Sequence, residues 1–110
     1  MTEHLTAWDD RAARVGGNGV AKRAIPGAGA SLVHVTVPAG VSAPRHSHDH
    51  EQFVQILSGS GILETEQGRK PFSAGSVFHF PSGTWHAAVF ETETVMIETN
   101  LAADGRDPSP

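Results

Sequence analysis

The stretch His46-Ser-His-Asp-His-Glu-Gln-Phe-Val-Gln-Ile-Leu-Ser-Gly59 decides the fold that we predict for this chain. Its second half, residues 52–57, is a short apolar run that ends at a turn rich in serine and glycine, as β-strands commonly do. On an extended chain, alternate residues point to the same side. The stretch can therefore present four potential ligand side chains to one side of the chain, namely His46, His48, His50 and Gln52.

Other candidate strands lie on both sides of this stretch. Residues 32–37 alternate three valines with Leu32, His34 and Thr36, which is the period-two signature of a strand with one buried face. Four further candidates, each bounded by turn residues, cover residues 62–66, 77–80, 85–90 and 94–99. No sustained helical period interrupts them. Turn signals at intervals of about 8–12 residues predict an all-β sandwich or barrel.

The chain divides into three parts. Residues 1–30 are polar and rich in glycine, with a loop predicted over residues 25–30, and we expect them to form an N-terminal arm. Residues 31–103 form the predicted barrel. Residues 104–110 are expected to be a flexible tail.

Composition limits the classes of function. The length of 110 residues fits one domain, and 38% hydrophobic with 18% charged residues is typical of a globular chain. The absence of cysteine excludes disulfides and thiolate metal sites and is consistent with a cytoplasmic location, which we predict. Neither a signal peptide nor a membrane span is expected, because no apolar run is long enough. With a net charge of −4 and no basic cluster, neither nucleic acid nor membrane is an expected partner.

Histidine is the unusual component, with seven residues in the chain. Two imidazoles at alternate positions of an extended segment can reach one metal ion at about 2.0–2.1 Å, provided that they are neutral. His86, which follows the turn Pro81-Ser-Gly83, is the best candidate for a third imidazole. The cluster around His46 and His48 is, by itself, equally compatible with a polar surface loop.

Two spaced motifs extend this interpretation. The pattern Gly40-x5-His46-x-His48-x3-Gln52-x6-Gly59 resembles the first motif of the cupins, and Gly75-x5-Pro81-x-Gly83-x2-His86-x3-Phe90 resembles the second. The resemblance implies a jelly-roll-like antiparallel β-barrel. It also implies one divalent metal ion (Ni, Zn, Fe or Mn) on His46, His48 and His86, with Gln52 as the fourth ligand. Small cupins are commonly homodimers whose N-terminal strands cross the interface, so residues 1–30 are expected to contact a second subunit.

Gln52 stands where most cupins carry glutamate. A neutral oxygen donor leaves the metal its full charge, which favours polarisation of a substrate carbonyl or hydroxyl over redox chemistry. The alternative is that Gln52 packs nearby while water completes the coordination. Glu51 is expected on the opposite face of the strand, and His50 is expected to support the ligands rather than to bind. His34 and His79 are predicted to be hydrogen-bonded barrel residues without a ligand role.

The sequence around His46 is most similar to the pectin and alginate degradation cupins, which open the ring of 4,5-unsaturated uronates. That resemblance implies a small-molecule substrate, with Glu98 as an acid–base group and Arg45 or Arg106 pairing with the substrate carboxylate. Asn100 stands where we expect an aromatic residue. We therefore predict a Lewis-acid isomerase or lyase, with two alternatives: a metal-dependent dioxygenase, or a non-catalytic cupin that binds or senses a small molecule.

Overall fold

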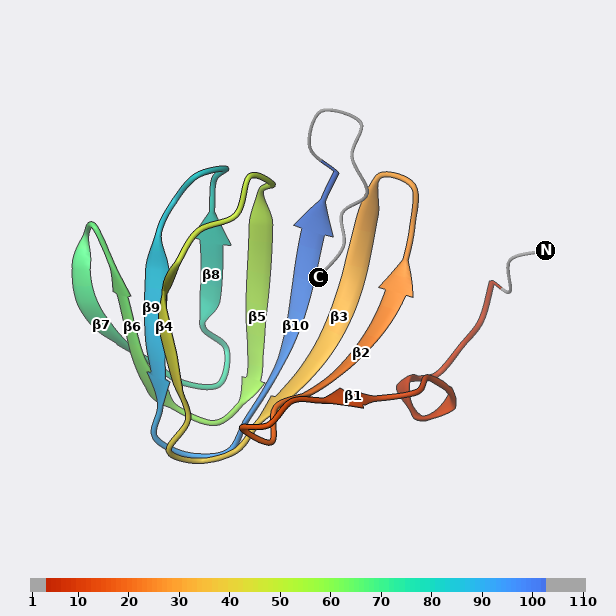
Figure 1. Cartoon of the computed structure of the whole chain (residues 1–110), viewed down its shortest axis with the longest axis horizontal. Helices are drawn as coiled ribbons and strands as arrows, with labels where there is room; N and C mark the ends of the chain where they lie inside the picture. The colour runs from red at the N-terminus through yellow and green to blue at the C-terminus, as the bar shows by residue number, and fades with distance from the viewer. Residues whose placement is uncertain (1–3, 103–110) are drawn as a thin grey trace.

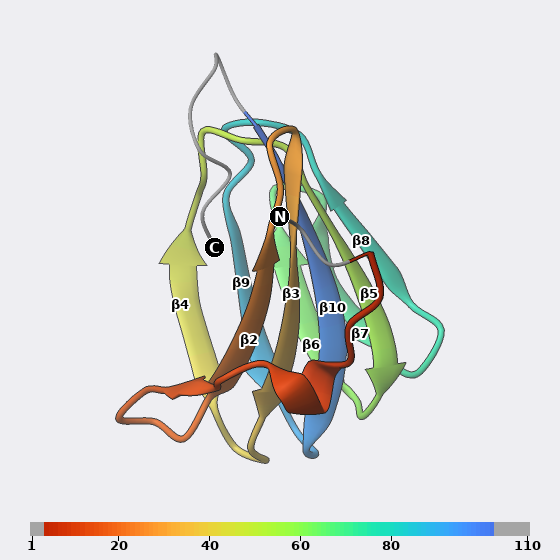
Figure 2. The ribbon, with the colours of Figure 1, turned by 90° about the vertical axis from the view of Figure 1, so that its right-hand side faces the viewer.

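The computed structural model describes residues 4–102, which form two antiparallel β-sheets that wrap around a common interior (Figures 1 and 2). A short 3-10 helix, η1, covers Trp8–Asp10. The strands are β1 (Arg14–Val15), β2 (Ala21–Pro26), β3 (Ala30–Val37), β4 (Ser42–His46), β5 (Gln52–Ser58), β6 (Gly61–Thr65), β7 (Gly68–Phe72), β8 (Val77–Phe80), β9 (His86–Phe90) and β10 (Thr94–Leu101). Within the described residues, no helix has the length and apolar character needed to span a membrane.

One sheet has six strands in the order β1-β2-β3-β10-β5-β8, and the other has four in the order β4-β9-β6-β7. The predicted all-β fold is confirmed, and all six predicted strands are present with ends shifted by at most two residues. Strands β4 and β7 were not predicted, and both contain a proline, Pro44 and Pro71. Both strands lie at the edges of their sheet, where a missing backbone N–H is tolerated.

The barrel begins earlier in the chain than the predicted boundary at residue 31. Residues 21–26 form β2 and pair with β3, so Ile25 and Pro26 end a strand instead of opening a loop. Before β2, the ring centroid of Trp8 lies 5.3 Å from that of His34. The predicted tail, residues 104–110, lies outside the described residues.

Alternation along the strands builds the core. On β3 the exposed fractions of Val33, Val35 and Val37 are 0%, 1% and 2%, as the period of two predicts. Ring contacts join the two sheets, because Phe72 of β7 packs edge-on against Phe78 of β8 and Phe90 of β9, at centroid distances of 5.2 and 5.6 Å. Each such side chain contributes about 1.5–3 kcal/mol by burial.

Polar residues replace apolar ones toward one end of the same interior. On β10, Met96 gives way to Glu98 and then to Asn100, which pairs in register with Gln52 of β5. In the opposite sheet, the last residue of β4 and the first of β9 are register partners, and both are histidines, His46 and His86. The interior is thus packed with phenylalanines around Phe72 and carries polar groups toward the end that holds His46 and His86.

A substitution at Gly61 tests the packing of the phenylalanine side chains. It pairs with Phe72 and Phe90 in neighbouring strands, and a Cβ atom there would collide with the Val89 carbonyl oxygen and the Phe72 ring. We expect Gly61→Ala to lower the free energy of unfolding by about 1–3 kcal/mol in urea denaturation. Gly17→Ala is the matched control, since a Cβ there meets nothing within 4 Å. Equal stabilities of the two variants would contradict the packing described.

Candidate metal centre

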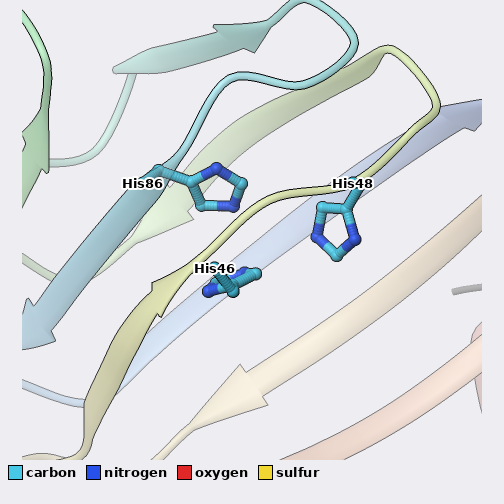
Figure 3. Close-up of side chains that lie close together, drawn as sticks. All are labelled: His46, His48 and His86. Carbon is cyan, nitrogen blue, oxygen red and sulfur yellow. The ribbon is translucent and has the colours of Figure 1, made fainter.

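His46, His48 and His86 form one cluster. His46 ends β4, His86 begins β9, and His48 lies two residues after His46 in the loop that leads to β5. Figure 3 shows the three rings converging from these two segments. Each residue offers one nitrogen atom, and these atoms all lie within 4.8 Å of one another. Nitrogen ligands on opposite sides of one ion are about 4 Å apart, so the cluster is close to the size that a single ion needs.

Backbone carbonyl groups orient two of the rings. The register between β4 and β9 shifts between Ala43 and His46, and such bulges re-aim side chains. Within this bulge, His46 donates from Nδ1 to the carbonyl oxygen of Pro44 at 2.7 Å. His86 likewise donates from Nδ1 to the carbonyl oxygen of Thr84 at 3.3 Å. In the neutral form of both residues, Nδ1 carries the proton and Nε2 has the lone pair that a metal requires.

The turn before His86 also holds the loop that carries His48. The amide of Gly83 donates to the His48 carbonyl oxygen at 2.7 Å, and the Ser82 hydroxyl donates to the Asp49 carbonyl oxygen at 2.8 Å. On the other side, the ring of Phe80 stacks on His86 with a centroid distance of 3.9 Å and an interplanar angle of 3°. The two histidine motifs are therefore tied together through backbone contacts as well as through a shared site.

Gln52 lies in the wall of the same cavity as the three histidines and is 4% exposed. Its Nε2 donates to Oδ1 of Asn100 at 2.8 Å. The amide oxygen of Gln52 does not take part in this hydrogen bond. Asn100 is fully buried, and its Nδ2 has no hydrogen-bond partner among the described residues. Coordination by Gln52 stays a prediction, and the hydrogen bond to Asn100 suits that role because it engages the nitrogen end of the amide.

The three histidines line a cavity of about 630 Å³. Its walls are mainly apolar side chains from both sheets. Besides the three clustered histidines and Gln52, the interior polar residues that line it are Lys22, His50, Glu98 and Asn100. A mostly apolar pocket with a few convergent polar groups is typical of a small-molecule site.

The residues that the sequence analysis assigned to catalysis fall in different places. Glu98 lines the cavity. Arg45 is exposed, and its guanidinium lies 3.7 Å from the ring centroid of Trp85, so the structure does not bring it to the cluster. Arg106 lies outside the described residues.

The other histidines also have defined positions. His79 donates from Nε2 to Oε2 of Glu51 at 2.6 Å on the outer face, where Glu51 was expected. His34 contacts Trp8 as described above. His50 lines the cavity and stacks on His48 at 4.9 Å, and its Nε2 has no partner within residues 4–102.

Burial shifts the pKa values of three groups at the site. Desolvation, together with the neighbouring charge of His46, lowers the pKa of His86 to about 4. The pKa of His48 is lowered by burial first and then by His46 and His50. Burial raises the pKa of Glu98, an effect that the charge of Lys22 partly opposes. These shifts favour the neutral form of His48 and His86, which is the state that binds metal.

Lys22 is the site residue that sequence reasoning missed. It lies on β2, in a segment without a clear hydrophobic period, and only its pairing with Val35 shows that it faces inward. No local pattern marked Lys22, because the strand that carries it was not predicted.

Comparisons with known proteins agree with this architecture. The sequence profile of the cupin domain family matches residues 33–99. No curated protein matches the sequence. Among solved structures, an RmlC-like cupin from Shewanella frigidimarina has a TM-score of 0.83 at 21% identity, covering 98% of this chain and 93% of that one. KdgF from a Halomonas species has a TM-score of 0.76 at 21% identity, with coverage of 93% and 92%.

A larger protein contains the same fold. Oxalate decarboxylase from Bacillus subtilis, which has Mn(II) centres, matches with a TM-score of 0.75 at 17% identity. The match covers 90% of this chain and 29% of the decarboxylase. Identities this low establish a shared fold and leave the chemistry to be argued from the residues.

The low pKa of His86 predicts how metal-free protein responds to acid. An imidazole in the unfolded chain titrates near 6.5, whereas folded His86 takes up its proton only near pH 4. The unfolded state therefore binds more protons between these values, and stability falls as pH drops through this window, by on the order of 3 kcal/mol. Glu98, with its raised pKa, acts in the opposite direction, so the effect must be measured as a difference between proteins.

We expect the stability difference between wild type and His86→Asn, measured by urea unfolding in chelator, to shrink from pH 7 to pH 4. His34→Asn, which changes a histidine outside the cavity, serves as the control. Parallel pH profiles for wild type and His86→Asn would contradict the burial of a neutral His86.

Proposed function

This chain belongs to the cupin domain family, and on that basis we propose that it is a metal-dependent enzyme acting on a small oxygen-rich substrate such as a sugar acid. The observation that carries the proposal is the convergence of three imidazoles at a cavity of about 630 Å³. A cavity of that volume accommodates a molecule of monosaccharide size.

The donor set fits a divalent ion. Neutral imidazoles suit Zn, Fe, Ni and Mn, and the buried Gln52 offers an uncharged oxygen beside them. When bound, such an ion supplies Lewis acidity to a substrate hydroxyl or carbonyl oxygen. His46 and His86 present Nε2 because their Nδ1 atoms are engaged, and Asn100 engages the nitrogen end of the Gln52 amide.

Glu98 is the candidate proton-transfer group. It is the only carboxylate among the described residues that line the cavity, and burial raises its pKa, as is common for carboxyl groups that transfer protons. Ring opening of a 4,5-unsaturated uronate needs such a group. The anomeric hydroxyl loses a proton, the bond from the anomeric carbon to the ring oxygen breaks, and that oxygen takes up a proton, so no atoms are gained or lost.

The comparisons add indirect support. The Bacillus subtilis relative in fold is named for decarboxylation of oxalate, a small dicarboxylate, and has Mn(II) centres. This is an analogy at the level of the fold. It favours a small carboxylic acid as substrate and a metal as cofactor, while the reaction itself is argued from Gln52 and Glu98.

Metal binding should stabilise the protein. An ion that binds only the folded state at 100 times its dissociation constant adds about 2.7 kcal/mol, which is a rise in Tm on the order of 10 °C for a domain of this size. We expect Zn(II) or Mn(II) to raise the Tm of chelator-treated wild type by this amount. His34→Asn should respond in the same way and His86→Asn should not. A wild-type Tm that changes with neither metal nor chelator would count against the proposal.

Gln52→Glu tests the proposed chemistry directly. We expect the variant to retain metal and to lose about 10–100-fold in turnover of an unsaturated uronate, because an added negative charge weakens Lewis acidity. Gln55→Glu makes the same substitution at an exposed position of the same strand and should leave turnover unchanged. The measurement is the loss of ultraviolet absorbance of the unsaturated uronate, with all proteins loaded with the same metal.

The same assay separates the alternatives. Equal turnover by wild type and Gln52→Glu would show that the neutrality of Gln52 is irrelevant. Oxygen consumption by wild type with small diketones would indicate a dioxygenase instead. Ligand binding without turnover of either kind would indicate a binding or sensing cupin.

A further inference from the structure

Lys22 enters the interior of the barrel. Its register partner on β3 is Val35, which is 1% exposed and lines the same cavity. The next residue, Arg23, pairs with His34 on the outer face. Because side chains alternate along a strand, Lys22 points into the cavity and Arg23 points to the outer face.

The ammonium group of Lys22 lacks an ion-pair partner in the part of the chain that the structure describes. Glu98 is the one carboxylate among the described cavity residues, and it is not within ion-pair distance of Lys22. Lys22 is half-buried on the wall of a mainly apolar cavity, and a cation in such a position is commonly paired with an anion. The missing partner is therefore expected to come from outside the described residues.

Electrostatic reach links Lys22 to the histidine cluster. Burial is the main cause of the lowered pKa of His48 and of the raised pKa of Glu98. The positive charge of Lys22 adds to the shift of the His48 pKa and opposes the shift of the Glu98 pKa. Lys22 thus acts on the same space as a metal-binding candidate and the candidate proton-transfer group. The other cationic side chain on the lining, Arg14, is exposed on β1.

We infer that Lys22 is an anion-binding residue of this cavity, and that it holds the carboxylate of a small organic acid whose other oxygen atoms reach the imidazole cluster. This inference rests on the metal-dependent function proposed above and names the residue that binds the carboxylate of its acidic substrate. It also transfers to Lys22 the role that the sequence analysis gave to Arg45, whose guanidinium is stacked on Trp85 outside the cavity.

The register of the sheet gives the order of the groups. Gln52 and Asn100 face each other in one row, Glu98 and Val54 lie in the next, and Met96, Val35 and Lys22 lie in the third. Successive inward rows are about 6.6–6.8 Å apart along the strands. A ligand bound at the cluster and by Lys22 therefore extends past Glu98, which is where a proton-transfer group is useful.

The test uses a matched pair of probes, D-galacturonate and D-galactose, which share a ring and differ in the carboxylate. Their dissociation constants are measured by calorimetry or NMR titration for wild type, Lys22→Met and Lys22→Arg, each with and without Zn(II). Lys70→Met is the control, because Lys70 is exposed on the edge strand β7 and does not line this cavity.

We expect metal-loaded wild type to bind galacturonate at least about 10-fold more tightly than galactose. Lys22→Met should remove this preference by weakening galacturonate alone, Lys22→Arg should retain most of it, and Lys70→Met should match wild type. Zn(II) affinity of Lys22→Met should be equal to or higher than that of wild type, because a positive charge near His48 is removed. This readout shows that the fold and the metal site are intact.

Two outcomes would overturn the inference: no preference for galacturonate in wild type, or a preference that survives in Lys22→Met. A third outcome separates it from the proposed function. If wild type binds no Zn(II) but still prefers galacturonate in a Lys22-dependent way, the anion site stands and the metal-dependent function fails.

Discussion

Each strand of this barrel turns every second side chain inward, so one interior surface must supply both the hydrophobic core and the polar centre. On β10 this surface runs from Met96 through Glu98 to Asn100, and on β5 it runs from Ile56 through Val54 to Gln52. The phenylalanine contacts that join the two sheets lie on the apolar part. The gradient from apolar to polar along the same strands is what allows a chain of this size to hold a functional cavity and remain folded.

Buried polar groups at the polar end lower the stability of the fold, and packing in the rest of the barrel must compensate for this loss. His86 is held neutral by burial, Glu98 is desolvated, and Asn100 keeps a buried amide nitrogen without a partner in residues 4–102. Unsatisfied buried donors are uncommon and weaken a fold by about 1–3 kcal/mol each. Such groups persist where a bound ligand offsets their destabilising effect. A dication at the imidazoles and a bound acid beside Lys22 would offset the effect of several of these groups.

The comparison with other cupins shows what the fold leaves open. An RmlC-like cupin, KdgF and one part of oxalate decarboxylase share this architecture at identities of 21%, 21% and 17%. A barrel shared so widely does not specify a reaction, and the discriminating features are individual side chains. In this chain they are the neutral Gln52 with its Asn100 partner, the half-buried Glu98, and Lys22, whose ammonium group has no ion-pair partner within residues 4–102.

The sequence by itself determined the strands with a clear period of two and the grouping of the histidines. Both depend on local spacing, because alternation places Val33, Val35 and Val37 on one face and a turn of fixed length carries His86. The tertiary structure decided which other residues reach the cavity. Lys22 faces inward only because β2 pairs with β3, and Arg45 lies outside on Trp85 while His46, after the bulge in β4, reaches the cluster. Strand register, bulges and burial join residues far apart in the chain, so no local pattern encodes them.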